Sequence, residues 1–114
     1  MHEMGIAEEI LEIVNQQAKE GNIVADITTV YFKASFLNSI YPDSLKFYYD
    51  AIKERYPSLN KSNLEIEILP LRHTCPKCRE VKELFELFYE CEKCQMPSEI
   101  EIDTTMTVDS FTYN

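Results

Sequence analysis

Four cysteines in the second half of the chain are the residues with the clearest chemistry. They form two Cys-x-x-Cys pairs, Cys75 with Cys78 and Cys91 with Cys94, and twelve residues separate the pairs. Two intervening residues allow a tight turn that directs both sulfur atoms of a pair to one point. Two such turns facing each other offer four thiolates in a tetrahedron. Soft thiolates in this geometry select zinc or iron over hard cations, so the spacing predicts one bound metal ion.

Two alternatives to a zinc site are open for these cysteines. The cysteines could form disulfides, or they could hold an iron centre of the rubredoxin or iron–sulfur kind. The chain start, Met1-His2-Glu3-Met4-Gly5, is acidic and mixed and does not resemble a secretory signal, so we expect a cytoplasmic protein. In that reducing compartment paired cysteines hold metal more often than they form disulfides. A closed shell of four thiolates leaves no open coordination position, so we expect structural rather than catalytic zinc.

His73 precedes the first pair by two residues. It could be a fifth or substitute ligand, or a histidine at a strand end or on the surface. Since four cysteines are available, we favour the second interpretation. The turns also carry Arg79 and Gln95 where a glycine often follows the second cysteine.

Charge and composition restrict the partners. The 114 residues are 45% hydrophobic and carry a formal net charge of −9. A nucleic-acid partner requires a basic footprint, and no stripe of Lys or Arg is visible. No apolar run approaches the ~20 residues that cross a bilayer, so we expect no membrane partner. An acidic surface instead suits protein partners or the handling of metal cations.

The remaining pattern predicts an α+β fold, with two helices on one face of a three-stranded mixed sheet. Apolar residues at helical spacing predict helices over 4–19 and 42–56, the second bounded by prolines. Residues 27–33, 64–69 and 105–113 read as strands. The first two strands and the helix between them should form a right-handed parallel crossover.

The cysteine segment is predicted to be a zinc-ribbon-like module inserted between the second and third strands. Residues 83–89 and 98–102 can supply its short strands. We therefore divide the chain into an α/β domain, 1–72 and 104–114, and a zinc-binding module, 73–103. The module is too small to hold a core of its own, so it should unfold without its metal.

His2 offers a second kind of metal site. A histidine at position two is usually part of a frayed terminus. However, a free α-amine, nearby amide nitrogens and the His2 imidazole can surround one ion, and four nitrogens in a plane suit nickel(II) or copper(II). Glu3 adds a backbone nitrogen or a carboxylate. The amides must lose protons to bind, so the affinity should fall as the pH drops.

Met1-His2-Glu3-Met4, followed by an amphipathic helix, resembles the start of the HypA/HybF family. Members are nickel-delivering metallochaperones of [NiFe]-hydrogenase maturation. The stretch 41–47 (YPDSLKF) resembles the start of the family's second helix, and 64–67 (LEIE) resembles its second strand. Both cysteine pairs and the closing strand follow in the family's order. The resemblance covers essentially the full length.

The resemblance implies a transferable nickel ion held by the Met1 amine, His2 and Glu3, with the four-cysteine zinc keeping a structural role. It implies two partners: a nickel-loading GTPase of the HypB type and the hydrogenase large-subunit precursor. Urease maturation proteins are further partners of some members. The task is transfer, so the resemblance implies that the chain is not an enzyme.

This sequence departs from the family pattern in one loop. Many members carry an acidic residue where Tyr41 stands, and here Asp43 follows two residues later. Members also commonly carry glycine around positions 34 and 35, where this chain has Ala34 and Ser35. The loop backbone is therefore expected to differ.

Two rival functions make different predictions. A zinc-ribbon adaptor without transferable metal would keep its function after His2→Ala. A redox or metal-dependent enzyme that uses the cysteines would have reactive thiols and would lose zinc on mild oxidation. The acidic charge argues against the adaptor when its partner is DNA, and a closed thiolate shell argues against the enzyme.

Overall fold

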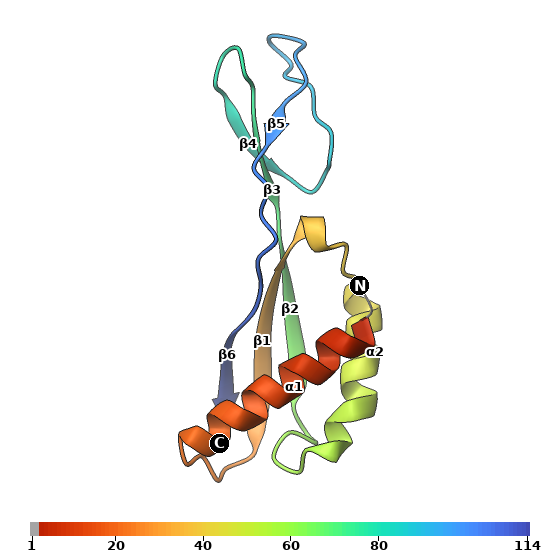
Figure 1. Cartoon of the computed structure of the whole chain (residues 1–114), viewed down its shortest axis with the longest axis vertical. Coiled ribbons are helices and arrows are strands. Elements are labelled where there is room, and N and C mark those ends of the chain that lie inside the picture. Colours follow the sequence, from red (N-terminus) through yellow and green to blue (C-terminus); the bar gives the residue numbers. More distant parts are fainter. Residues whose placement is uncertain (1–2) are drawn as a thin grey trace.

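The computed structural model describes residues 3–114 as an elongated molecule, with principal extents of 56 × 25 × 17 Å. Both helices and a three-stranded sheet make up one end, and the cysteine segment makes up the other (Figure 1). No helix among the described residues is long and apolar enough to cross a membrane.

The second helix begins at the predicted residue, and the first is one residue longer than predicted at each end. Helix α1 spans Glu3–Glu20 and buries one apolar face, made of Ile6, Ala7, Ile10, Leu11, Val14 and Ala18. Helix α2 spans Pro42–Ile52, and a 3₁₀ helix, η2, follows at Lys53–Arg55. The predicted second helix ran to residue 56. Its last turn is instead tightened into 3₁₀ geometry, which satisfies the terminal carbonyl groups by shorter-range bonds.

Three strands form the mixed sheet of the α/β end, as predicted. Strand β1 (Ile27–Ser35) lies in the middle, parallel to β2 (Asn63–Leu69) and antiparallel to β6 (Met106–Tyr113). Alternate residues of β1 face the helices, and both helices cover the same face (Figure 1). The core consists of this face and the apolar faces of α1 and α2. The predicted fold class is confirmed.

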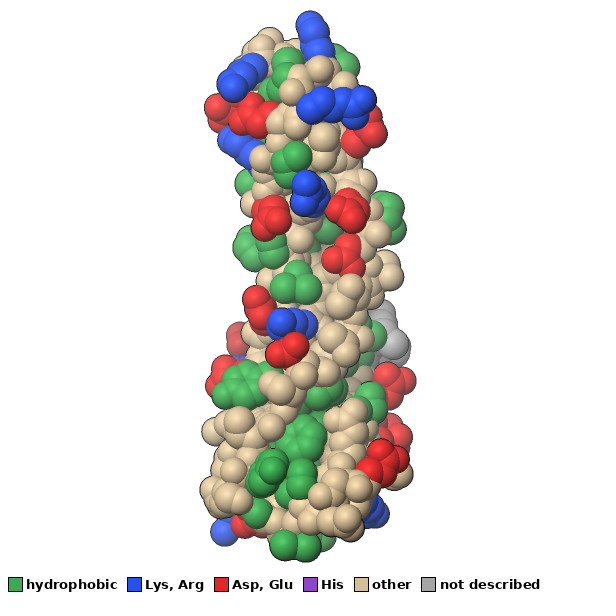
Figure 2. All heavy atoms as spheres, turned by 90° about the vertical axis from the view of Figure 1, so that its left-hand side faces the viewer, with side chains coloured by type: hydrophobic (Ala, Val, Ile, Leu, Met, Phe, Trp, Pro, Cys, Tyr) green, Lys and Arg blue, Asp and Glu red, His purple; other side chains and the backbone are tan. Residues whose placement is uncertain are grey.

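Strand β6 forms one edge of this sheet. Figure 2 turns that side of the molecule toward the viewer and shows apolar side chains gathered over its lower half. Met106, Val108 and Phe111 of β6 are only partly buried against the core. Over the upper half, acidic and basic side chains alternate without forming a basic stripe on this face.

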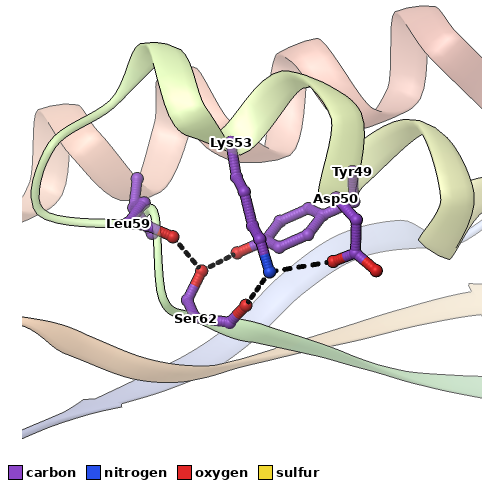
Figure 3. Close-up of polar contacts among 5 residues, drawn as sticks. All are labelled: Tyr49, Asp50, Lys53, Leu59 and Ser62. Atoms are coloured by element: carbon purple, nitrogen blue, oxygen red, sulfur yellow. Dashed lines mark hydrogen bonds and ion pairs between the residues drawn. The ribbon is translucent and has the colours of Figure 1, made fainter.

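Polar contacts at the opposite edge fasten α2 to the turn that leads into β2 (Figure 3). The hydroxyl of Tyr49 lies 2.6 Å from Ser62 Oγ, and Ser62 Oγ donates to the carbonyl of Leu59, also at 2.6 Å. The single Ser62 hydroxyl proton is thus committed, so Tyr49 is the donor in the first bond. Lys53 Nζ donates to the Ser62 carbonyl at 2.9 Å and pairs with Asp50 at 3.0 Å. Burial raises the pKa of Tyr49 to about 12.

The cysteine segment contains a second, smaller sheet. Strand β3 (Leu71–Thr74) lies between β4 (Val81–Leu84) and β5 (Glu99–Ile100), and both pairings are antiparallel. Only Pro70 separates β2 from β3, and proline has no N–H to continue the ladder. The chain therefore passes from one sheet to the other almost without interruption. The division at residue 73 stays a prediction.

One predicted strand of this segment is wrong in its extent. Residues 83–89 were expected to form a strand, but β4 ends at Leu84. Residues 85–89 are irregular, although their apolar composition is typical of a buried strand. Three short β-strands and two cysteine turns leave too little interior to cover those side chains.

Candidate metal centre

Each Cys-x-x-Cys pair folds into the same hydrogen-bonded turn. The amide N–H of Arg79 donates to the carbonyl of Cys75 at 2.9 Å, and that of Gln95 donates to the carbonyl of Cys91 at 2.8 Å. In return, the N–H of each first cysteine donates to the carbonyl five residues later, at 2.9 Å in both turns. Backbone bonds therefore build two equivalent turns, which lie together at the end of the molecule farthest from α1 (Figure 1).

The two turns bring all four sulfur atoms together. Every Sγ atom of Cys75, Cys78, Cys91 and Cys94 lies within 4.8 Å of the others. The Sγ atoms of Cys78 and Cys91 are 3.8 Å apart. A tetrahedron with Zn–S bonds of about 2.3 Å has edges of about 3.8 Å, whereas a disulfide brings two sulfurs to about 2.05 Å. The cysteines are free in the structure, and their spacing fits a shared metal ion better than disulfides.

Ionisation of the cluster also favours a cation at its centre. The backbone N–H groups of Cys78 and Lys77 lower the pKa of the Cys75 thiol to about 7, although its burial acts in the opposite direction. Burial, together with the neighbouring sulfurs of Cys78 and Cys75, raises the pKa of Cys94 to about 12. Four thiolates cannot coexist at this distance without a compensating charge. The donor set therefore fits a divalent soft-metal ion that displaces the remaining protons.

The sulfurs differ in their contact with solvent. The first cysteine of each pair, Cys75 or Cys91, is buried, whereas Cys94 is half-buried and Cys78 is exposed. An ion pair of 3.4 Å between Lys93 and Glu80 joins the two turns across the surface. Such exposed pairs contribute little to stability. The four sulfurs are thus the main groups able to hold the two turns together.

His73 does not join the cluster. The residue is 1% exposed, its Nε2 donates to the carbonyl of Glu86 at 2.7 Å, and its Nδ1 lies 2.6 Å from Ser98 Oγ. Both nitrogens therefore have partners inside the module, and neither is free to bind a metal ion. The interpretation as a non-ligand fits this geometry. His73 lies near the end of β3, as one expectation had it, but the alternative place on the surface is wrong because the residue is buried. In β3 the buried positions alternate, which places His73 inward with Leu71.

Of the predicted nickel ligands, the structure describes Glu3, which lies at the other end of the molecule. Met1 and His2 are outside the described residues, and Glu3 is the first residue of α1. A Glu3 carboxylate oxygen accepts a hydrogen bond of 3.4 Å from Ser44 Oγ, in the first turn of α2. Sequence reasoning missed Ser44, although it lies within the family-like stretch 41–47. Its position two residues after Pro42, in the first turn of the predicted helix, was the available signal.

Hydrogen bonds hold the loop before α2, which has Ala34 and Ser35 where the resemblance led us to expect glycine. Ser35 is extended, and its Oγ accepts from the N–H of Leu37 in the 3₁₀ helix η1 (Phe36–Asn38). The left-handed residue of this loop is Ser39, with φ 52°. The carbonyl of Thr105 accepts from Ser35 N at 2.8 Å and from Asn38 Nδ2 at 2.9 Å. Tyr41 is 71% exposed and caps α2 without a side-chain bond.

The fold and the four-cysteine centre define a small metal-binding protein, in which an α/β sheet domain carries a zinc-ribbon-like insertion. The family described as hydrogenase/urease nickel incorporation metallochaperone HypA matches residues 1–113. The chain therefore belongs to the HypA family of nickel metallochaperones for hydrogenase maturation.

Individual relatives agree with this assignment. The chain is 32% identical to the hydrogenase maturation factor HypA of Albidiferax ferrireducens over 94 residues, which cover 82% of this chain and 81% of the relative. It is 32% identical to the hydrogenase maturation factor HypA of Campylobacter jejuni over 95 residues, which cover 83% and 82%.

A solved structure has the same fold. The solution structure of the Ni metallochaperone HypA from Helicobacter pylori matches 99% of this chain and 97% of its own, with a TM-score of 0.65 and 19% identity. At this identity the match supports the fold only.

Proposed function

We propose that this chain carries one nickel(II) ion at its start and delivers it during [NiFe]-hydrogenase maturation. The ligands would be the Met1 amine, His2 and Glu3. The observation that carries the proposal is the family match over residues 1–113, which includes all three positions. The order Met-His-Glu also supplies nitrogens that suit a tetragonal nickel site.

Transfer requires ligands that exchange one at a time. A site at the start of α1 can be approached by a partner's ligands from several directions, because Glu3 stands at the helix end rather than in the core. Nickel is the cargo of the chain, so its release is as necessary as its binding. This task is binding and transfer rather than catalysis, and we therefore propose that the chain is not an enzyme.

Zinc would have the separate role of holding the module. Cys75, Cys78, Cys91 and Cys94 would supply the closed shell, which fits the distances between their sulfurs. Zinc is favoured over iron because the proposed role requires no electron transfer. The partners would be a nickel-loading GTPase of the HypB type and the hydrogenase large-subunit precursor, with urease maturation proteins as further clients. These reactions would take place in the cytoplasm.

Nickel titration of four proteins tests the proposed site: the native chain, His2→Ala, a chain with a short N-terminal extension, and one with the same extension after Asn114. The native and C-terminally extended chains should each bind one nickel ion. His2→Ala removes the imidazole and the N-terminal extension displaces the free amine, so each should weaken binding tenfold or more. Equal binding by all four would show that the chain start is not the site. The adaptor alternative predicts that same result.

A further inference from the structure

An exposed apolar segment lies between β4 and the second cysteine turn. Phe85 is 56% exposed, Leu87 49% and Phe88 87%. Large apolar side chains that gather on a surface commonly mark a contact with another molecule. The sequence predicted this stretch as a strand because it is apolar. Its side chains are exposed because the described part of the fold offers no layer that covers them.

The segment forms one wall of a groove between the two ends of the molecule. The groove has a volume of about 780 Å³. Its other wall is the loop from η1 to α2, with Leu37, Ile40 and Tyr41, and Ile68 of β2 contributes between them. Phe36 and Phe85 meet edge to face, with ring centroids 6.1 Å apart, and thereby join the walls. A volume of this order, roughly 300–1,000 Å³, is typical of built ligand sites.

Both walls are held by hydrogen bonds. Buried His73 donates to the carbonyl of Glu86, which fixes the backbone of the exposed segment. Asn38 and Ser35 both donate to the carbonyl of Thr105, which fixes the opposite loop. The groove is therefore formed before any partner arrives, and binding would cost little ordering of the chain.

The charge of the groove identifies the kind of occupant. Glu86 is the charged residue among those that line it, and no lysine or arginine lines it. Asp43 follows Tyr41 by two residues in the first turn of α2, where Ser44 contacts Glu3, and the whole chain carries a net charge of −9. An apolar groove with an acidic margin is complementary to apolar anchor side chains flanked by lysine or arginine.

We propose that this groove docks a short segment of a protein partner of nickel transfer, with apolar anchors and adjacent basic residues. The inference rests on the proposed function and adds the surface that recognises the partner. Tyr41 of the groove directly precedes α2, whose Ser44 contacts Glu3. A segment bound in the groove therefore places its parent protein beside the nickel-carrying end, where ligands can be exchanged.

Binding of the purified nickel-loading GTPase, and separately of the purified hydrogenase large-subunit precursor, tests the proposal. Each is titrated against the native chain, Leu87→Ser/Phe88→Ser, Glu86→Gln and the control Val24→Ser. Val24 is 99% exposed and lies before β1, away from the groove. The double variant should weaken binding of at least one partner tenfold or more. Glu86→Gln should weaken it less and flatten its salt dependence, because only a charge is removed. Val24→Ser should bind as the native chain does.

Metal measurements on the same samples separate the two proposals. Nickel titration and zinc content should be equal in the native chain and all variants, because no groove residue is a proposed ligand. A native chain that binds no nickel contradicts the proposed function, whatever the groove does. Partner binding that is unchanged in the double variant, or absent in the native chain for both partners, overturns the docking proposal. It is also overturned if sedimentation shows a native dimer that the double variant dissociates, because the occupant is then a second copy.

Discussion

Arg79 and Gln95 occupy equivalent positions in the two cysteine turns, and both have a left-handed backbone, with φ values of 67° and 51°. Each is the residue that directly follows the second cysteine of its pair. Each donates its N–H to the carbonyl of the first cysteine, so the conformation is required for the turn to close. The turns thus adopt the geometry that usually selects glycine, while carrying side chains that disfavour it.

Glycine at these positions should stabilise the zinc-bound module. A left-handed backbone costs a residue with a Cβ about 1–2 kcal/mol, and glycine avoids this cost. Glycine is also more flexible in the unfolded chain, which offsets about 0.5–1 kcal/mol of the gain. Arg79→Gly and Gln95→Gly should therefore each gain about 0.5–1 kcal/mol. In competition with a chelator, each variant should retain zinc about threefold more tightly than the native chain.

Lys77→Gly supplies the matched control for that experiment. Lys77 is exposed in the same turn and does not have a positive φ, so glycine there brings only the entropic cost. Lys77→Gly should lower zinc retention slightly, and it should also lower the temperature of the thermal transition slightly. If all three glycine variants shift together, backbone strain is not the cause.

The sheet was predictable because its pattern is local. In β2, apolar residues alternate with exposed glutamates. Strand β1 is dense in β-branched and aromatic residues, so each strand can be recognised within its own sequence. The end of β4 was not predictable, because the stretch 85–89 is also rich in apolar and aromatic residues and therefore looks like a continuing strand. Such a stretch becomes a buried strand only if another part of the fold packs against it. That packing depends on residues far away in the sequence and cannot be recognised within the stretch itself.

The sites were predictable to different degrees for the same reason. The spacing within each Cys-x-x-Cys pair is local and predicts that its two sulfurs lie together. Two such pairs suit one tetrahedral metal ion, and this predicted that all four sulfurs converge. The contact between Glu3 and Ser44 joins residues 41 positions apart and depends on how α1 crosses α2. The inward position of His73 depends on the pairing of β3 with its neighbours. Such relationships arise from tertiary packing and required the structure.

Removal of zinc should unfold the cysteine module and leave the α/β sheet largely folded. The module has one short sheet, and the bonds within each turn cannot hold the two turns together. Cys91→Ser removes a buried ligand and should reduce bound zinc from one ion per chain to a small fraction. Metal analysis and amide hydrogen exchange measure both effects, with loss of protection expected in 71–100. Ser98→Ala, which leaves all four sulfurs, should keep the zinc.

Ser44 provides a test of how Glu3 would bind nickel. If the Glu3 carboxylate is a ligand, the Ser44 hydroxyl orients it through its bond to Oε1. Ser44→Ala should then weaken nickel binding about tenfold, the low end for loss of such a partner because the bond is long, and Ser44→Thr, which keeps a hydroxyl, should restore most of it. An unchanged affinity in Ser44→Ala would instead indicate that Glu3 contributes through its backbone nitrogen. Zinc content serves as the internal control.

Tyr49 should make the α/β end sensitive to alkaline pH. Burial raises its pKa from 10.0 to about 12, so the folded state holds the phenol proton more tightly than the unfolded state. The stabilising contribution is complete below pH ~10 and is lost as the pH rises toward ~12, a total of about 2–3 kcal/mol. Tyr49→Phe should remove this alkaline loss, while costing about 1 kcal/mol at neutral pH because the bond to Ser62 is gone. Urea unfolding at pH ~8 and pH ~11 measures both effects. Tyr31→Phe, on the open face of β1, should retain the alkaline loss, and a Tyr49→Phe protein that still loses it would exclude Tyr49 as the source.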